Sequence, residues 1–335
     1  MPAAAPPLVE VLVLKGAMAS SIALTLDVLA TANQVRAAAG RAPAFRVRLS
    51  GSGAPATRAF MGLAGGAEPL GRPAIVIVPG LGLTTEAAVT ARLKQRDAVA
   101  ARRILVAAVA QGAEICTSCS GAFLFASAGL LAGRRATTTW WLAPLFRRLH
   151  PDVRLDTDAL LVTDGPVTTA GAAMAQVDLM LAVVARHADA RLADHCARYL
   201  LLDQRRSQSR YMALGFLAAA DERIARADAF ARKRLADDIK VDDLAAAAGL
   251  SPRTFARRVA RATGLSPVRF LQRLRVERAM ELLETTRLPF DEIACQVGYA
   301  EPSTLRRLIR RNGGEGPRAL RPSARSEEGR GAERV

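Results

Sequence analysis

The sequence predicts two domains: an α/β domain whose mostly parallel sheet has helices on both faces, followed by an all-α domain. Two observations lead to this prediction. The chain has 335 residues, whereas a single hydrophobic core rarely grows beyond about 250–300 residues. Apolar segments of strand length alternate with segments of helical periodicity as far as His187, which is typical of a parallel sheet with crossover helices. After His187 the pattern is helical without interruption.

The first domain begins with a buried strand and continues as alternating helices and strands. The opening run VEVLVL is almost entirely apolar, as expected of a short strand inside a core. Apolar residues at helical spacing predict helices over 20–39, 84–110, 120–131 and 174–187. The predicted strands are Val9–Leu14, Phe45–Leu49, Ile75–Val78, Glu114–Cys116 and Leu160–Val162.

The domain boundary is predicted from a change in composition near residue 203. The stretch LLDQRRSQSRY is polar and lacks strong periodicity, so we expect domains at 8–202 and 221–322, joined by a linker at 203–220. Between Asp221 and Arg321 no segment has the pattern of a strand. The closing segment 323–335 has too little apolar surface to offset the entropy of ordering it, and we expect it to be disordered.

The composition indicates a soluble protein with an anionic partner. The formal charge is +16 and the pI is near 11.1, and basic proteins gain affinity for phosphate polymers by releasing counterions. Basic residues outnumber acidic ones about two to one between Ser251 and Arg325. A generally basic protein without such a partner is the alternative. No apolar run reaches the ~18–20 residues of a membrane span, and the N-terminus has no signal layout, so we expect a cytoplasmic protein without membrane contact.

The cysteines indicate neither a disulfide framework nor a metal site. Four thiols in a long chain without a secretion signal are expected to stay reduced. Cys116 and Cys119 form a CxxC, but a zinc site needs four ligands, and the sequence has no second CxxC or nearby histidine pair. We therefore expect no metal and no cofactor. The other two cysteines are Cys196 and Cys295.

The most informative feature is an internal repeat in the second domain. VDDLAAAAGLSPRTFARRV aligns with FDEIACQVGYAEPSTLRRLI, at an offset of 49 residues up to Gly249 and Gly298 and of 50 residues from Thr254 and Thr304 onward. In each copy a short helix ends at the glycine, which readily adopts the left-handed conformation of a sharp stop. A second helix begins shortly afterwards at a proline. This order is helix-turn-helix geometry.

The second helix of each copy has an apolar face and a polar, arginine-bearing face. In the first copy Phe255, Val259 and Ala262 face inward, and in the second copy Leu305, Leu308 and Ile309 do so. The outward faces present Arg253 and Arg257 in the first copy and Ser303, Arg307 and Arg310 in the second.

Such outward faces suit the DNA major groove, because arginine pairs with guanine and hydroxyls meet bases or phosphates. Ordinary amphipathic helices with solvated arginines are the alternative, which two copies in register disfavour. Between the copies, Pro267–Thr285 has the pattern of one long helix. It could hold the two units apart so that they reach successive major grooves.

The second domain resembles the DNA-binding domain of the AraC/XylS family, which is this pair of units joined by a long helix. The motifs LAAAAGLSPRTFARRV, TGLSPVRFLQRLRVERAMELLETT, EIACQVGY and GPRALR carry the resemblance over about 100 residues. By position, it implies base contacts from Arg253 and Arg257 in the first unit and from Ser303, Thr304 and Arg307 in the second. The complete set of expected DNA-binding residues is Arg253, Thr254, Arg257, Arg258, Ser303, Thr304, Arg307 and Arg310.

Three positions depart from the family's pattern. Ala256 stands where family members often have a polar reader, which limits it to contact with a thymine methyl group. In the second unit Ile309 replaces a usual phenylalanine, and Leu320 replaces a usual tyrosine.

A second motif lies in the first domain. In AEICTSCSGAFLFASAGLL a strand enters a turn of small residues centred on Cys119, and a helix follows from Ser120. Such an elbow exposes a nucleophile at a helix N-terminus, where the dipole can lower a thiol pKa. Cysteine catalysis also needs a base, usually histidine. The three histidines, at 150, 187 and 195, are not beside this turn.

Residues 8–200 resemble the class I glutamine-amidotransferase-like, PfpI-type domain, through CSGAFLFASAGLLAGRRATTTWW, HPDVRL and TDGPVTTAGAAMAQVDLML. With the AraC-type end, the chain is similar to the GlxA family of regulators, which implies a flavodoxin-like, amidotransferase-like domain that senses a ligand. Relatives have a histidine where this chain has Thr139, which argues against hydrolase activity. The candidate ligand-binding residues are Cys119, Ser120, Gly121, Ala170, Gly171, Asp27 and Asn33.

Together these observations predict a sequence-specific DNA-binding transcriptional regulator rather than an enzyme. We expect a cytoplasmic, nucleoid-associated homodimer that binds double-stranded promoter DNA and acts with RNA polymerase as an activator. Its small-molecule effector would be amino-acid-like or a quaternary amine, as the resemblance implies. One alternative is a Cys-dependent hydrolase or amidase of the PfpI type with an attached DNA-binding domain. The other is a redox sensor that uses Cys116 and Cys119.

Overall fold

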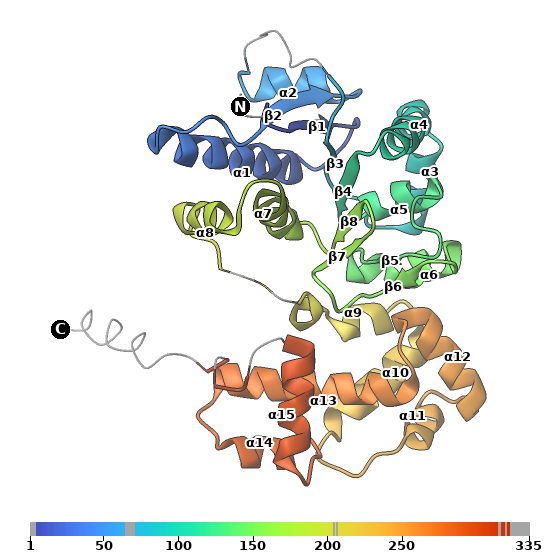
Figure 1. The fold of residues 1–335 in the computed structure, drawn as a ribbon. Coiled ribbons are helices and arrows are strands. Elements are labelled where there is room, and N and C mark those ends of the chain that lie inside the picture. Colours follow the sequence, from blue (N-terminus) through green and yellow to red (C-terminus); the bar gives the residue numbers. More distant parts are fainter. Residues whose placement is uncertain are drawn as a thin grey trace, which may run out of the picture. The chain divides into compact units, whose positions relative to one another are not determined.

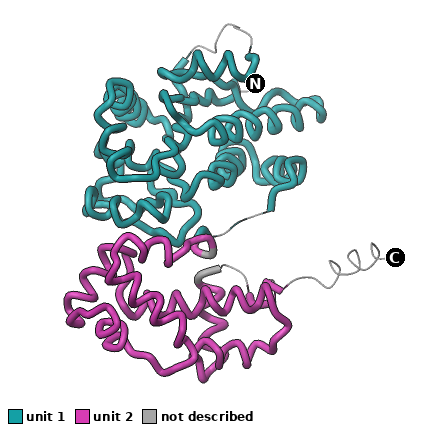
Figure 2. The backbone as a smooth tube through the Cα atoms, turned by 180° about the vertical axis from the view of Figure 1, so that it is seen from behind, with its two compact units in different colours: residues 1–208 teal, residues 209–335 magenta. Residues whose placement is uncertain are grey.

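The computed structural model describes residues 5–63, 71–203, 205, 207–313, 316–318 and 320–321. The chain divides into two compact units, residues 1–208 and 209–335 (Figure 2). This division falls within the stretch expected to be a linker, part of which forms η2 (Ser209–Tyr211) and α9 (Leu214–Ala218). The segment 323–335, expected to be disordered, lies outside the described residues.

The first unit is built on a six-stranded sheet. The strands of this unit are β1 (Leu8–Leu12), β2 (Arg46–Ser50), β3 (Ile75–Val78), β4 (Glu114–Ser118), β5 (Arg135–Ala136), β6 (Arg154–Leu155), β7 (Leu161–Asp164) and β8 (Val167–Ala170). The order in the main sheet is β2-β1-β3-β4-β8-β7, and β5 pairs with β6 separately (Figure 1). Neighbours in the main sheet are parallel except for the antiparallel pair β7 and β8. The predicted mostly parallel sheet is confirmed.

Helices cover both faces of this sheet. They are α1 (Ala19–Ala38), α2 (Ala54–Phe60), α3 (Glu86–Leu93), α4 (Arg96–Ala110), α5 (Gly121–Ser127), η1 (Trp140–Leu142), α6 (Ala143–Leu149), α7 (Ala175–His187) and α8 (Ala190–Tyr199). Helices α1, α7 and α8 pack into one core, and α3, α4 and α5 into the core on the opposite face (Figure 1). The single helix predicted over 84–110 is interrupted at Lys94 and Gln95, so that it forms α3 and α4.

The central strands supply side chains to both cores. Ile75 and Ile77 belong to the core beside α1, whereas Val76 and Val78 belong to the core beside α4, because successive strand residues point to opposite faces. The parallel pairing also brings the carboxyl ends of β3, β4 and β8 to one edge of the sheet. In open α/β sheets this edge is where ligands bind.

The second unit contains helices joined by turns and loops, and no strand, within its described residues, 209–313, 316–318 and 320–321. After α9 come α10 (Glu222–Lys233), α11 (Val241–Ala247), α12 (Pro252–Thr263), α13 (Pro267–Thr285), α14 (Phe290–Gln296) and α15 (Pro302–Gly313). The helix predicted over Pro267–Thr285 is α13, with the same bounds.

The predicted repeat forms two helix-turn-helix units, α11–α12 and α14–α15. The turns contain Gly249 and Gly298, whose φ angles of +63° and +76° lie in the left-handed region that favours glycine. Helix α13 lies between the units in sequence and contributes to the core of the second. Its Leu283 packs in one apolar cluster with Leu305 and Ile309 of α15.

Candidate DNA interface and cysteine elbow

Helix α12 presents an arginine face over a buried apolar stripe. Ser251 caps its N-terminus by accepting a hydrogen bond from the Thr254 amide at 3.4 Å. Phe255 is fully buried, and so is Val259 one turn later, so the opposite side of the helix must face solvent. Arg253 and Arg257 are exposed on that side.

Arg258 belongs to a different environment. Its Nη1 donates to both carboxylate oxygens of Asp221 at 3.0 Å, and the Asp221 side chain is 8% exposed. Asp221 also caps α10 by accepting from the Arg223 amide at 3.1 Å. Arg258 thus ties α12 to the start of α10, which sets it apart from Arg253 and Arg257.

Helix α15 repeats this plan. Leu305 and Ile309 are fully buried, and Ser303, Arg307 and Arg310 are exposed. Each of the two outer helices, α12 and α15, contains four arginines and no acidic residue. Thr254 and Thr304 are half-buried at equivalent positions, and the Thr254 hydroxyl lies 3.1 Å from that of Ser251. The structure therefore brings most of the expected DNA-binding residues to two similar surfaces.

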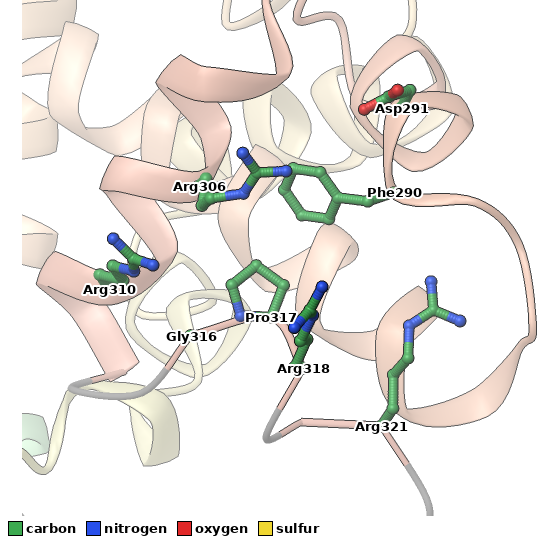
Figure 3. A pocket seen from close by; sticks show the side chains of 8 residues that line it. All are labelled: Phe290, Asp291, Arg306, Arg310, Gly316, Pro317, Arg318 and Arg321. Atoms are coloured by element: carbon green, nitrogen blue, oxygen red, sulfur yellow. The ribbon is translucent and has the colours of Figure 1, made fainter.

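An arginine-lined groove beside α15 was not predicted from the sequence. A cavity of about 650 Å³ is lined by the start of α14, one flank of α15 and the turn after it. Arg310, one of the expected DNA-binding residues, belongs to this groove together with Arg306 (Figure 3). The Arg306 guanidinium stacks 4.9 Å from the centre of the Phe290 ring. The remaining lining residues are Asp291, Gly316, Pro317, Arg318 and Arg321.

In the first unit, the predicted elbow is a strained turn between β4 and α5. Cys119 has φ +55°, a left-handed conformation that is uncommon for a residue other than glycine. Its amide donates to the carbonyls of Ala170 and Gly171, at 3.1 and 2.7 Å. The Thr138 hydroxyl donates to the Cys119 carbonyl at 2.8 Å. These bonds from neighbouring loops hold the turn in place.

The Cys119 thiol is not activated. It is 1% exposed, and burial raises its pKa, while hydrogen bonds from Ser120 act in the lowering direction. The expectation that a helix N-terminus would lower this pKa is therefore wrong, because desolvation of the thiolate outweighs the other effects. Thr139, which stands where the resemblance led us to expect a histidine, acts on the pKa of Cys119 in the lowering direction, and its own hydroxyl has no hydrogen-bond partner among the described residues.

The three histidines lie in other surroundings. His150 packs against the rings of Phe123 and Phe146. His187 Nε2 lies 3.2 Å from a carboxylate oxygen of Glu114, and His195 is exposed on α8. None of these contacts provides Cys119 with a base.

Buried hydroxyls that the sequence analysis missed surround the elbow. A Cβ built on Gly80 would lie 3.1 Å from Ser21 Oγ, 3.2 Å from Ser118 Oγ and 3.3 Å from Cys119 Cβ. Both serines are fully buried, and neither hydroxyl has a hydrogen-bond partner among the described residues. Buried polar atoms normally find partners, so these two mark a site able to bind a polar group.

Gln176 adds a further unpaired atom on the α1 side. Its Nε2 donates to Thr25 Oγ1 at 2.8 Å, and Thr25 in turn donates to the Ser21 carbonyl at 2.7 Å. Gln176 Oε1 has no partner among the described residues. Ser21 and Thr25, two hydroxyl residues one helical turn apart on α1, were the sequence signal that could have identified this cluster.

The other expected ligand residues have different roles. Asn33 fastens α1 to the chain before β2: its Oδ1 accepts from the amides of Ala44 and Phe45, and its Nδ2 donates to the Phe45 carbonyl. It lies 12 residues beyond Ser21 on one helix, about 18 Å along the axis, so the structure does not bring it to the elbow. Asp27 is exposed.

Glycine is required for close packing at two elbow positions. A Cβ on Gly121 would lie 2.0 Å from Thr117 Oγ1, and one on Gly171 would lie 2.2 Å from Gln208 Oε1. Gln208 therefore fills the space beside Gly171. Its side chain is almost fully buried, although it belongs to a stretch expected to be a polar linker.

A separate cavity of about 380 Å³ lies where β1 and β2 end, between the start of α1 and α2. Its lining includes Lys15, Ile22 and Phe60 but none of the expected elbow residues. Among the described residues no cluster of histidine, cysteine or carboxylate side chains is arranged to bind a metal. The described helices include none long and apolar enough to span a membrane.

A family model described as a helix-turn-helix domain matches residues 244–323. Over 194 residues the chain is 25% identical to the HTH-type transcriptional regulator CdhR of Pseudomonas aeruginosa, with 57% of each chain covered. It is 29% identical over 215 residues to the HTH-type transcriptional regulator GlxA of Rhizobium meliloti, covering 60% of this chain and 63% of the relative. The chain thus matches less than two thirds of the length of these relatives.

Among solved structures, the first unit is similar to a ThiJ/PfpI family protein from Pseudomonas syringae. The TM-score is 0.43 at 17% identity, with 60% of this chain and 76% of that chain covered. The C-terminal unit contains a helix-turn-helix domain, as predicted.

Proposed function

We propose that this chain is a sequence-specific DNA-binding transcriptional regulator whose outer helices α12 and α15 each enter a major groove. The observation that carries this proposal is the duplication of one surface: an exposed arginine face over a fully buried apolar pair, Phe255 and Val259 in α12 and Leu305 and Ile309 in α15. Guanidinium groups on a groove-sized helix suit both guanine edges and phosphates. The names of the relatives as transcriptional regulators support it.

The proposed base readers are Arg253 and Arg257 in α12, with Ser303 and Arg307 in α15. They are exposed, and the two arginines of α12, like Arg307, form no ion pair within the described residues. Thr254 and Thr304 stand at the edge of these faces and are proposed to contact the backbone. Arg258 is proposed to stabilise the first helix-turn-helix unit through its ion pair with Asp221 rather than to read bases.

Selection of sequences from a random duplex pool with the full chain tests this proposal. We expect enrichment of one motif with two half-sites about one helical turn apart, and loss of that enrichment in the double variant Arg257→Ala, Arg307→Ala. The control variant is Arg234→Ala, an exposed arginine of the same unit that pairs with Asp237. If the wild type enriches no motif, the proposal is wrong.

We also propose that the elbow binds the effector, a small amino-acid-like or quaternary-amine metabolite. The unpaired hydroxyls of Ser21 and Ser118 and the unpaired Gln176 Oε1 support a polar ligand at the sheet edge. A ligand that binds only the native state raises the melting temperature. Titration with glycine betaine and with amino acids should therefore raise the Tm of the wild type. The rise should be lost in Ser118→Ala and kept in Ser127→Ala, whose hydroxyl donates to the Leu124 carbonyl outside the cluster; no rise with any of these compounds contradicts the proposed class.

The regulator is further proposed to act as a homodimer that activates transcription with RNA polymerase. Light scattering of the full chain should give twice the monomer mass, and transcription in vitro from the selected motif should increase when the chain is added. A monomer or a decrease in transcript would contradict this part.

A further inference from the structure

We infer that the arginine groove beside α15 is a phosphate site that grips the DNA backbone in the second helix-turn-helix unit. The inference rests on the proposed function and adds residues that play no part in base reading. Four arginines line the groove and Asp291 is its one acidic lining residue among those described. Such an excess of positive charge favours an anion, and guanidinium groups match phosphate oxygens in geometry.

The groove borders the reading face of α15. At about 100° per residue, Arg310 lies about 60° around the helix axis from Arg307, and Arg306 lies further round in the same direction. Figure 3 shows Arg306 and Arg310 on α15 beside the groove. A helix in a major groove has a phosphate backbone along each of its flanks. The DNA strand that passes this flank of α15 would contact Arg306 and Arg310 from α15 and Arg318 from the turn after it.

Two of the arginines are held in position before any ligand binds. Arg306 stacks on the Phe290 ring, and the Arg321 guanidinium donates to the Leu288 carbonyl. A side chain that is already ordered loses less entropy on binding. In the first helix-turn-helix unit, the positions equivalent to Arg306 and Arg310, at the offset of 50 residues, are Ala256 and Ala260. This groove is therefore specific to the second helix-turn-helix unit.

The test is the salt dependence of binding to a duplex of random sequence. Each phosphate contact contributes about 0.9 to the slope of log K against log salt concentration. Arg318→Gln should therefore reduce the slope by about 0.9, and Arg306→Gln with Arg318→Gln by roughly twice as much. Arg234→Gln is the control and should leave the slope unchanged.

The outcomes separate this inference from the proposed function. If the wild type shows no salt-sensitive binding, the proposed function itself is wrong. If the wild type binds and both variants retain its slope, the groove is not a phosphate site, and an acidic protein segment becomes its better occupant. Arg318 is exposed on a turn, so Arg318→Gln keeps the test valid if loss of the Arg306–Phe290 contact disturbs folding.

A different observation supports a second inference: we propose that Gln208 and Ser209 transmit the state of the elbow to α13. Gln208 Nε2 donates to Thr137 Oγ1, to the Thr138 carbonyl at 3.0 Å and to the Ala159 carbonyl at 3.3 Å. Its Oε1 accepts from the Ala172 amide at 3.1 Å. Thr138 is the residue whose hydroxyl holds the Cys119 carbonyl. Gln208 thus bonds directly to the loops that form the elbow.

The next residue is anchored in the second unit. Arg273, buried in α13, donates to the Ser209 carbonyl. Gln208 and Ser209 are joined directly by one peptide bond, so a displacement of Gln208 acts on the backbone of Ser209. A ligand that changes the Thr138 or Gly171 loops must shift or release Gln208, and the effect passes through Ser209 to Arg273. A ligand can act in this way only if it favours one of the two arrangements.

Hydrogen exchange of the full chain tests this path without DNA or effector, so its result does not depend on the proposed function. Gln208→Ala should accelerate exchange of the Ala172 amide and also of amides over 269–277 in α13. Gln272→Ala, an exposed glutamine of α13, is the matched control and should leave the Ala172 amide unchanged. Because linkage is reciprocal, Arg273→Met should accelerate exchange at Ala172.

Exchange in α4 reports whether the whole first unit has lost stability, because the bonds of Gln208 do not involve this helix. Faster exchange confined to 137–172 in Gln208→Ala, with α13 and α4 at wild-type rates, overturns the path. An unchanged Ala172 amide in Arg273→Met does so as well.

Discussion

The two outer helices share one apolar frame but differ along one flank. At the offset of 50 residues Phe255 corresponds to Leu305 and Val259 to Ile309, and all four are fully buried. On the flank, however, alanines of α12 correspond to the groove arginines of α15. The duplication has kept the packing and changed the charge. Under the proposed function, we therefore expect the first helix-turn-helix unit to contribute mainly to sequence reading and the second mainly to affinity.

The units also differ in what stabilises them. Arg258 in α12 pairs with Asp221, whereas the equivalent Leu308 packs against the apolar cluster of the second unit. The turns of the two helix-turn-helix units also differ in what surrounds their glycines. A Cβ on Gly249 would meet the mobile end of the Arg223 side chain at 2.8 Å, but one on Gly298 would meet the backbone carbonyl of Leu235 at 2.4 Å.

Removal of the equivalent core side chains should have the largest effect. Phe255→Ala is expected to reduce the free energy of unfolding by about 3–5 kcal/mol, and Leu305→Ala by about 2–5 kcal/mol. Urea denaturation followed by circular dichroism measures both. If either variant is as stable as the wild type, that side chain does not belong to the core described for its unit.

The two turn glycines offer a sharper contrast. Gly249→Ala should cost about 1–2 kcal/mol, the expense of a left-handed alanine, because the Arg223 guanidinium can move away. Gly298→Ala should cost more, since the Leu235 carbonyl belongs to the backbone. Thermal denaturation of both variants measures the difference, and equal losses would show that the turn at Gly298 relaxes freely.

Base reading is tested by Arg257→Ala against Arg307→Ala. Each should weaken binding to the selected motif by about 1–3 kcal/mol and relax specificity at one base pair. If the first helix-turn-helix unit is the main reader, Arg257→Ala will lose more of the preference for the motif over random duplex than Arg307→Ala will. Competition binding gives this ratio, and the opposite ranking would reverse the division of roles.

Introducing an arginine into the first helix-turn-helix unit, at the position equivalent to a groove arginine, is a gain-of-function test of the phosphate site. Ala260 is exposed on α12 and corresponds to Arg310. Ala260→Arg should steepen the salt slope by up to about 0.9 if a phosphate lies there, whereas Ala260→Gln should not. Identical slopes for the two variants would mean that the flank of α12 lies away from the backbone.

The smallest effect is expected from alkylation of the cysteine thiols, which should label one residue. Cys295 of α14 is exposed, whereas Cys116, Cys119 and Cys196 are buried. Burial raises the pKa of Cys116 to about 12 and that of Cys196 to about 11, so these thiols stay protonated at pH 7.5 and react slowly. Mass spectrometry after brief alkylation should find one label, on Cys295. Rapid alkylation of Cys116 or Cys119 would contradict the burial described and favour the redox alternative.

A raised thiol pKa also fixes the direction of the pH dependence of stability. The unfolded thiols ionise near pH 8.5, before the buried ones, so the native state holds more protons above that pH. Stability should therefore fall as the pH rises from about 8 to 10. In Cys116→Ser this fall should be smaller, as measured by urea denaturation at several pH values.

The helix-turn-helix frame could be predicted because its signals are local. The positions of Phe255 and Leu305 follow from helical periodicity, and Gly249 and Gly298 from the repeat. The groove could not be predicted in this way, because Arg306 meets Phe290 and the Arg318 turn only through the packing of separate segments. Gln208 shows the same limit: its neighbours in sequence are polar, and it is buried by bonds to residues 36 to 71 positions away.

The elbow shows which features expected from the sequence are present in the structure and which are not. The strand, the turn at Cys119 and the following helix were expected and are present. The hairpin of β7 and β8 was only half expected, because the sequence VTTA of β8 has little apolar character and only the strand near Leu160–Val162 was predicted. On α1 the structure brings Ser21, not Asn33, to the elbow. Helical periodicity gave the buried face of α1 but not which end of the helix meets the sheet edge.

The adjacency of Gln208 and Ser209 has a practical consequence for protein engineering. A chimeric protein can be made by cutting the chain at the polar stretch 203–220 and fusing the halves to foreign partners. Here a cut before Gln208 would separate this glutamine from the loops to which it bonds, and a cut after Ser209 would separate its carbonyl from Arg273. If the proposed path holds, a hybrid keeps its coupling only when Gln208 and Ser209 stay adjacent and Arg273 is carried with them, or when the recipient supplies an equivalent pair.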